Sequence, residues 1–111
     1  DINYLDIQTE IAYNNMCVEE NFITENVYNE KNEAKIILDL QKFNKEDRAI
    51  QKRIIFLAIN KLFGTTQGIE KIHIEDIIKL CNRNIGNKFL TPNKKTKIVI
   101  KNKKIYIERQ K

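Results

Sequence analysis

The sequence predicts a small α+β domain of about three helices with a C-terminal β-hairpin, and three observations lead to this fold class. Residues 44–64 repeat apolar side chains at helical spacing. Residues 97–108 contain two alternating segments, KIVIK and KIYIE, joined by the two residues Asn102-Lys103, a connection typical of hairpins. A length of 111 residues with 41% hydrophobic and 32% charged residues suits one folded domain. Residues 1–111 are therefore interpreted as a single domain.

The central helix is predicted to run from Asn44 to Gly64. Asn44 is a suitable N-cap, and the acidic side chains that follow it favour the positive end of the helix dipole. Gly64 stands where a left-handed C-cap glycine is expected. The second half is apolar nearly all round, which is typical of a helix buried among other elements. The first half carries Arg48, Lys52 and Arg53, which we expect to reach solvent.

Two further helices flank this one along the chain. Residues 1–20 are amphipathic with an acidic outer face, and we expect a helix that ends a connection from a preceding domain. The chain begins with Asp1 rather than Met, which indicates a piece of a longer protein. Residues 73–82 predict a shorter helix with Glu75 and Asp76 in its first turn.

The β signals lie on both sides of the central helix. Residues 34–40, AKIILDL, predict a strand with a buried centre. Residues 22–30 fit either a weak partner strand, giving a second strand pair, or a continuation of the first helix, and both interpretations stay open. Residues 88–90 predict a short extended segment. The expected hairpin pairs are Ile98–Ile107 and Ile100–Ile105 on an apolar face, with Val99–Tyr106 and Lys97–Glu108 on the other.

Charge is distributed unevenly along the chain. The net charge of +5 divides into −6 for residues 1–43, +2 for residues 44–82 and +9 for residues 83–111. A basic final third is the electrostatic pattern expected for a phosphate-rich partner. The alternative is a lysine-rich surface that only keeps the chain in solution.

Catalytic signals are missing from the sequence. There is no glycine-rich phosphate loop, no nucleophile beside a histidine and no cluster of metal ligands, so we expect neither catalysis nor a cofactor in this chain. The lone His73 is interpreted as a residue at a helix start. Cys17 and Cys81 are interpreted as reduced thiols of an intracellular protein. No apolar run approaches the roughly 18 residues that a membrane span needs.

Binding is therefore the favoured role, with lysines of the hairpin and its neighbouring loops contacting backbone phosphates. Tyr106 either stacks on an unpaired base or simply pairs with Val99 across the strands. The candidate RNA-binding residues are Arg48, Lys52 and Arg53 on the central helix, and Lys88, Lys94, Lys95, Lys97, Lys101, Lys103 and Lys104 in the final third.

Four segments in order resemble the tRNA(Ile)-lysidine synthetase family. Residues 50–55, IQKRII, are similar to its "LQRRII" segment, and residues 73–77, HIEDI, to its "H-x-E-D-I" helix. Residues 86–92, GNKFLTP, are similar to its "G-K-x-L-x-L-P" turn, and the hairpin follows as in the family. Two positions depart from the pattern, Asn87 within the Gly-Lys pair and Thr91 before the proline. The resemblance covers residues 35–107.

The resemblance implies a specific biology. Enzymes of this family use ATP with magnesium to adenylate C2 of the wobble cytidine of a minor isoleucine tRNA, and lysine then displaces the adenylate to give lysidine. Their ATP-pyrophosphatase-type domain carries an "SGGxDS" loop, which this chain lacks. The chain thus resembles the noncatalytic tRNA-binding region of a cytoplasmic enzyme, with the tRNA and the catalytic domain as its partners.

Two alternatives belong to other functional classes. In the first, the chain is a structural module that docks on the catalytic domain or forms a homodimer and touches no RNA. Its acidic N-terminal part and apolar faces would then be the docking surfaces. A DNA-binding regulator built on the central helix and residues 73–82 is less favoured, because the second helix is acidic at the end that would enter the groove.

Overall fold

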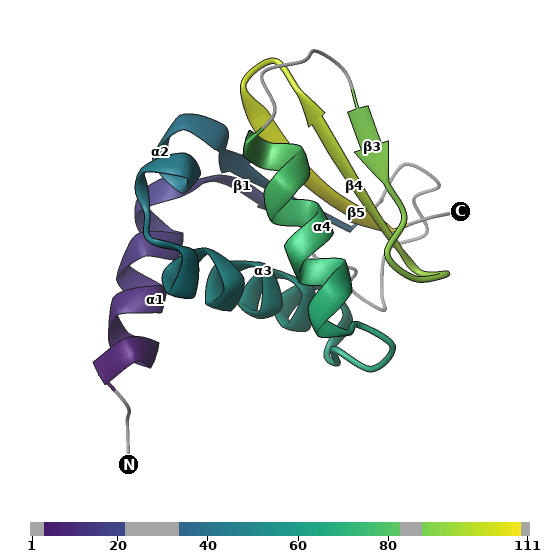
Figure 1. Cartoon of the computed structure of the whole chain (residues 1–111), viewed down its shortest axis with the longest axis horizontal. Coiled ribbons are helices and arrows are strands. Elements are labelled where there is room, and N and C mark those ends of the chain that lie inside the picture. Colours follow the sequence, from purple (N-terminus) through teal and green to yellow (C-terminus); the bar gives the residue numbers. More distant parts are fainter. Residues whose placement is uncertain (1–3, 22–33, 83–87, 110–111) are drawn as a thin grey trace.

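The computed structural model describes residues 4–21, 34–82 and 88–109, which form four helices and a five-stranded sheet (Figure 1). This architecture confirms the small α+β fold with a C-terminal hairpin. In chain order the elements are α1 (Tyr4–Met16), β1 (Cys17–Asn21), β2 (Lys35–Asp39), α2 (Leu40–Lys45), α3 (Arg48–Phe63), α4 (Lys71–Asn82), β3 (Lys88–Leu90), β4 (Thr96–Lys101) and β5 (Lys104–Arg109).

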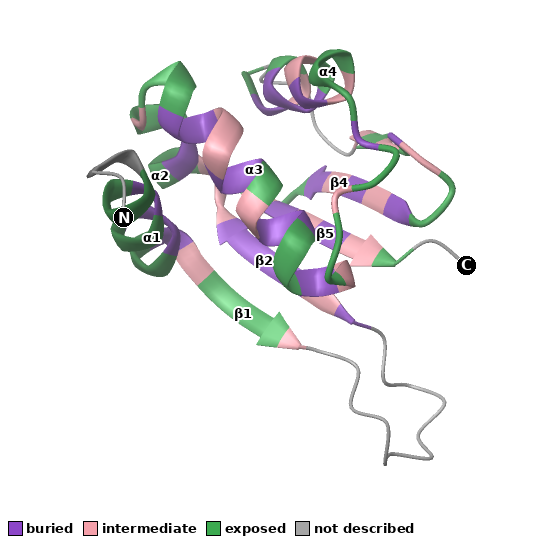
Figure 2. Cartoon of the chain, turned by 90° about the horizontal axis from the view of Figure 1, so that it is seen from below, coloured by how far each residue is buried: buried purple, intermediate pink, exposed green. Residues whose placement is uncertain are grey.

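The sheet combines strands from the N-terminal and the C-terminal parts of the chain. Its strand order is β1-β2-β5-β4-β3, and all neighbouring strands are antiparallel. The helices lie on one side of it (Figure 2). The strand expected at residues 34–40 is confirmed as β2. Its partner β1 lies inside the segment predicted to be helical to residue 20, because pairing with β2 outweighs the weak helical pattern there. Residues 22–30 lie outside the described residues.

The central helix begins later than predicted. Asp47, not Asn44, is its N-cap, and the Asp47 carboxylate accepts a hydrogen bond of 2.9 Å from the Ile50 N–H. Asn44 belongs to the separate short helix α2, and its side-chain amide donates to the Cys81 carbonyl at 3.1 Å. Glu46 and Asp47 have extended backbone conformations, which separate α2 from α3. The cap of α3 is therefore a carboxylate three residues further on, while the Asn44 amide bonds to α4 instead.

The helix ends and the start of α4 follow from local hydrogen bonds. Gly64 has φ +74°, which confirms the predicted left-handed cap of α3. α4 begins earlier than residue 73, so the expectation that Glu75 and Asp76 occupy its first turn is wrong. The His73 imidazole Nδ1 accepts a 2.9 Å hydrogen bond from the Glu70 N–H. This hydrogen bond satisfies the N–H of Glu70, the residue just before α4, and agrees with a structural role for His73.

The C-terminal hairpin has the predicted register. Asn102 and Lys103 have φ of 53° and 60°, the positive values that a two-residue type I′ loop requires. One face of the hairpin is buried under the helices, and the other is partly exposed. The confirmed pairs are Ile98–Ile107, Ile100–Ile105, Val99–Tyr106 and Lys97–Glu108.

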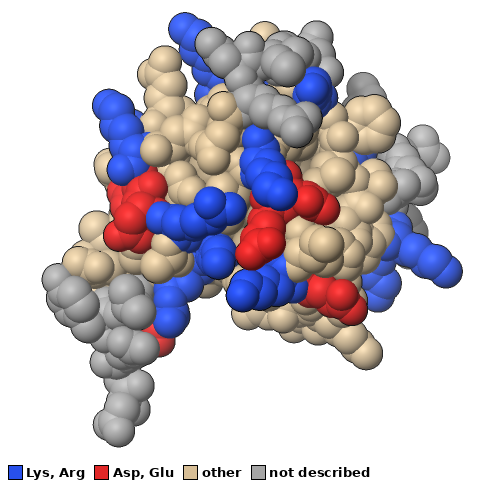
Figure 3. Space-filling view, in the orientation of Figure 1, with Lys and Arg blue, Asp and Glu red and all other residues tan. Residues whose placement is uncertain are grey.

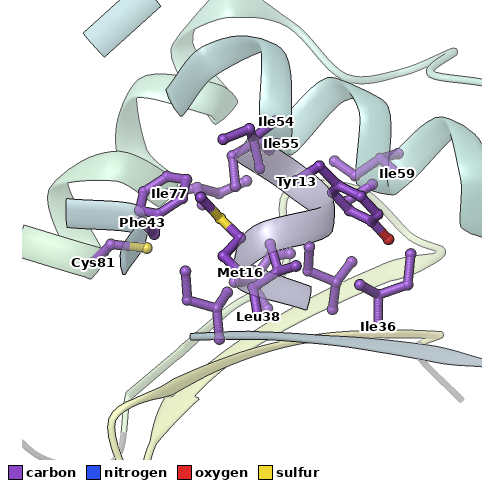
Figure 4. Close-up of a cluster of buried hydrophobic side chains, with 14 of the residues drawn as sticks. Tyr13, Met16, Ile36, Leu38, Phe43, Ile54, Ile55, Ile59, Ile77 and Cys81 are labelled. Atoms are coloured by element: carbon purple, nitrogen blue, oxygen red, sulfur yellow. The ribbon is translucent and has the colours of Figure 1, made fainter. Parts of the chain in front are cut away.

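The core fills the space between the helices and the covered face of the sheet (Figure 4). Ile36 and Leu38 of β2 are fully buried there, and Tyr13, Met16 and Phe43 contribute the largest buried side chains from α1 and α2. Packing against both sheet and helices explains why α3 is apolar over most of its circumference. Among the described residues, no helix combines the length and apolarity that crossing a membrane requires.

Candidate nucleic-acid interface

The sheet has an open face on the side away from the helices. Alternation along the strands sends Ile36 and Leu38 toward the helices and their neighbours outward. The register then aligns one row across four strands, composed of Ile37, Tyr106, Val99 and Phe89, which we call the aromatic row. Phe89 is 66% exposed, more than any other large apolar side chain that the structure describes. The open face thus offers a ring to solvent.

Three lysines gather where the hairpin turns. Lys101 and Lys104 are directly opposite each other on the open face, and Lys103 occupies the loop between them. We call these three residues the hairpin lysine cluster. Like charges at opposed positions of an antiparallel pair destabilise the sheet. An anionic partner bound across them would remove this repulsion.

No described carboxylate forms a salt bridge with the hairpin lysine cluster. Asp39 is the register neighbour of Lys104 on β2, but its carboxylate accepts a 3.0 Å hydrogen bond from the Lys42 N–H and caps α2. The salt bridges among the described residues lie elsewhere, between Lys35 and Glu19 and between Arg53 and Asp6. The cluster is therefore a local excess of positive charge.

Two lysines lie over the rings of the aromatic row. The Lys97 Nζ is 5.3 Å from the centre of the Phe89 ring, and the Lys101 Nζ is 4.9 Å from that of Tyr106. An exposed cation–π contact is worth about 0.5–1 kcal/mol, whereas stacking of a nucleic-acid base on an aromatic side chain is worth about 1–3 kcal/mol. A base can therefore displace each ammonium group from its ring and leave it free to contact a phosphate.

The open face is not uniformly basic. Glu108 is opposite Lys97, and Glu19 approaches Lys35 at 4.0 Å. Positive charge on this face is consequently concentrated at the hairpin end, beside Tyr106.

The ten predicted RNA-binding residues do not form one patch. Lys97 and the hairpin lysine cluster share the open face and its turn, whereas Lys88 is in register with Ile100 on the covered side. Lys94 and Lys95 lie in the β3–β4 loop, at the opposite end of β4 from the cluster. Six residues of strand separate these ends by about 20 Å.

The three predicted RNA-binding residues of α3 lie on the helix side of the sheet. The Arg53 guanidinium forms a 3.0 Å ion pair with Asp6 of α1, and Arg48 and Lys52 are on the same half of α3. In the view of Figure 3, basic and acidic side chains alternate over the surface. The helix side in that view therefore lacks a patch of one sign.

Phe89 was not among the predicted binding residues. The sequence shows it only as part of a three-residue extended segment, and its position beside Val99 depends on the pairing of β3 with β4. The one available signal was alternation, since Lys88 and Leu90 flank a residue that must face the other way.

A second surface feature is a groove of about 1060 Å³ between α1 and α3, which we call the α1–α3 groove. Its walls include the apolar side chains of Ile7, Ile11 and Phe56, which are 45%, 64% and 36% exposed. The α1 wall also carries Glu10, and the α3 wall carries Lys52. The groove is therefore lined by apolar side chains, with acidic groups on its α1 wall and basic groups on its α3 wall.

In the described part of the chain, no three His, Cys, Asp or Glu side chains are grouped so that they could hold a metal ion. Both cysteines are free thiols, and burial raises the pKa of Cys81 from 9.0 to about 12, so this thiol is not activated as a nucleophile. No protein-family model matches the chain, and comparison with curated proteins finds no match.

Proposed function

We propose that this chain is the noncatalytic tRNA-binding part of an enzyme of the tRNA(Ile)-lysidine synthetase type, acting in the cytoplasm. The type of enzyme and its substrate, a minor isoleucine tRNA, are proposed on the basis of the sequence resemblance. The hairpin lysine cluster is the structural observation that supports a role in binding, because its charge is unpaired with any described carboxylate. Lysines held on a rigid hairpin contact backbone phosphates and position the tRNA without reading its sequence.

Under this proposal the chemistry belongs to the catalytic domain of the parent enzyme. ATP and magnesium require a phosphate-binding loop and oxygen ligands. The chain has no "SGGxDS" loop, and its described carboxylates form no cluster that suits a metal ion. The residues described here do not fit these groups, and we assign this chain no step of adenylation or lysine transfer.

The test is tRNA binding across a salt series. Replacing Lys101, Lys103 and Lys104 by glutamine is expected to weaken binding of the minor isoleucine tRNA. It should also reduce the slope of log K against log salt by about 2–3, because each lost phosphate contact removes about 0.7–0.9. Fluorescence anisotropy of a labelled tRNA measures both quantities.

A charge-matched control separates a specific surface from general attraction. Lys45, Lys71 and Lys79 are exposed residues of the helices, and their replacement by glutamine changes the net charge equally. This control should leave the slope within about one unit of the unmodified chain. Initiator methionine tRNA and duplex DNA serve as competing ligands. The proposal is wrong if the chain binds no tRNA at low salt, or if both triple variants lose affinity equally.

The α1–α3 groove favours a second candidate function, a homodimer module without RNA contact. A groove with one acidic and one basic wall is complementary to itself, because a two-fold axis brings Glu10 of one copy toward Lys52 of the other. The same operation buries the exposed Ile11 and Phe56 side chains. A second copy of this chain is therefore the occupant that the groove fits.

Sedimentation equilibrium distinguishes the two candidates. A dimer is expected at micromolar concentrations, and Ile11→Glu should dissociate it, because a carboxylate would be buried without a partner. Val18→Glu is the matched control, since Val18 is 52% exposed and lies on β1 outside the groove. A chain that remains monomeric at all concentrations, or equal effects of both variants, would contradict the dimer.

A further inference from the structure

We propose that the aromatic row binds unpaired nucleotides, with one base stacked on Phe89 and another on Tyr106. This inference rests on the proposed tRNA-binding function and deepens it, because it names the part of an RNA that the open face accepts. It would confine the chain to loops, single-stranded ends or bulges, where base faces are accessible.

The exposure and setting of the rings support a stacking surface. Phe89 is 66% exposed although β3 is paired with β4, so the ring is held by backbone pairing and covered by little else that the structure describes. Tyr106 lies on the central strand pair and is partly exposed. Exposing an aromatic row to water is unfavourable and marks a candidate binding surface. Planar bases are ligands that can stack on such rings and cover them.

The spacing of the two ring-bearing positions argues against a double helix as the stacked ligand. Val99 of β4 separates Phe89 of β3 from Tyr106 of β5. Strands lie about 4.8 Å apart, so the two positions are about 10 Å apart. Successive bases of one duplex strand are only about 3.4 Å apart, and each covers the face of the next. Only a strand whose bases are splayed can place one base on each ring.

The neighbouring lysines favour a polyanion over an apolar peptide as the occupant. The Nζ atoms of Lys97 and Lys101 lie 5.3 Å and 4.9 Å from the centres of the two rings. Each ring is thus paired with a cation that can reach the phosphate of the nucleotide stacked there. The hairpin lysine cluster extends this positive charge beyond Tyr106. Rings and cations alternating in this way match the alternation of bases and phosphates in a single strand.

The test compares a labelled single-stranded RNA with a duplex of equal phosphate number, using the complete 111-residue chain. The unmodified chain should bind the single strand more tightly. Phe89→Leu and Tyr106→Leu should each lower that affinity by about 5- to 150-fold and leave the salt slope unchanged, because the phosphate contacts remain. Phe89→Tyr and Tyr106→Phe keep a ring at each position and should retain binding.

Phe56→Leu is the matched control, since Phe56 is also exposed but lies in the α1–α3 groove; circular dichroism checks that each variant is folded. If Phe89→Leu and Tyr106→Leu bind both RNAs as tightly as the unmodified chain, stacking is wrong while phosphate binding by the lysines stands. If the unmodified chain prefers the duplex, stacking is likewise overturned. If it binds neither RNA at low salt, the proposed function itself fails.

Discussion

Phe43→Ala is expected to destabilise the fold by about 3–5 kcal/mol, because it removes a large side chain from a core that cannot collapse around the loss. Phe43 has no exposed surface, and it lies beside Cys81 and Ile77 of α4 in the core (Figure 4). It is the one buried residue of α2, so without it that six-residue helix loses its main apolar contact. A cost of this size is a large fraction of the total stability of a typical domain.

Thermal unfolding measures this loss, and the melting temperature should fall by roughly 12–20 °C for a domain of this length. Phe89→Ala is the internal control, because the same side chain is 66% exposed on the open face. We expect it to change the unfolding free energy by less than about 1 kcal/mol. Equal effects of the two substitutions would show that the burial of Phe43 in this structure is incorrect.

Alkaline pH should destabilise the fold through buried Cys81. Burial raises the pKa of its thiol from 9.0 to about 12 in the folded state, so the folded chain keeps a proton that the unfolded chain releases. Stability is fully present below the unfolded pKa and is lost as pH rises above it. Between about pH 8 and about pH 10.5 the loss amounts to about 2 kcal/mol. Burial also raises the pKa of Tyr13 above its ordinary value of 10.0, which adds a loss of the same sign.

Urea unfolding at a series of pH values measures this dependence. Cys81→Ala removes the ionising thiol and should flatten the curve by about 2 kcal/mol over the same range, while the Tyr13 contribution remains. Because the two chains differ only at residue 81, the difference between the two curves isolates the thiol. Identical curves would contradict the burial of Cys81.

The candidate site was only partly predictable from sequence. The lysines and Tyr106 on the outer side of the hairpin followed from alternation and from the Asn102-Lys103 loop, because a two-residue loop fixes the register of both strands. Phe89 did not follow, since a three-residue strand carries almost no pattern and its register with β4 is set by pairing. The basic residues of α3 were grouped with the hairpin by charge alone, and charge does not reveal which side of a sheet a helix covers.

The sequence by itself determined the elements whose signals are local. Gly64 at the end of α3, the strand at β2 and the four predicted pairs of the C-terminal hairpin depend on backbone preferences and on spacing within a few residues. Only the tertiary structure decided the pairing of β1 and of β5 with β2, because these contacts join residues that are distant along the chain. The open face exists for the same reason. The described helices bury their apolar sides on one face of a single sheet (Figure 2), and these helices leave the opposite face uncovered.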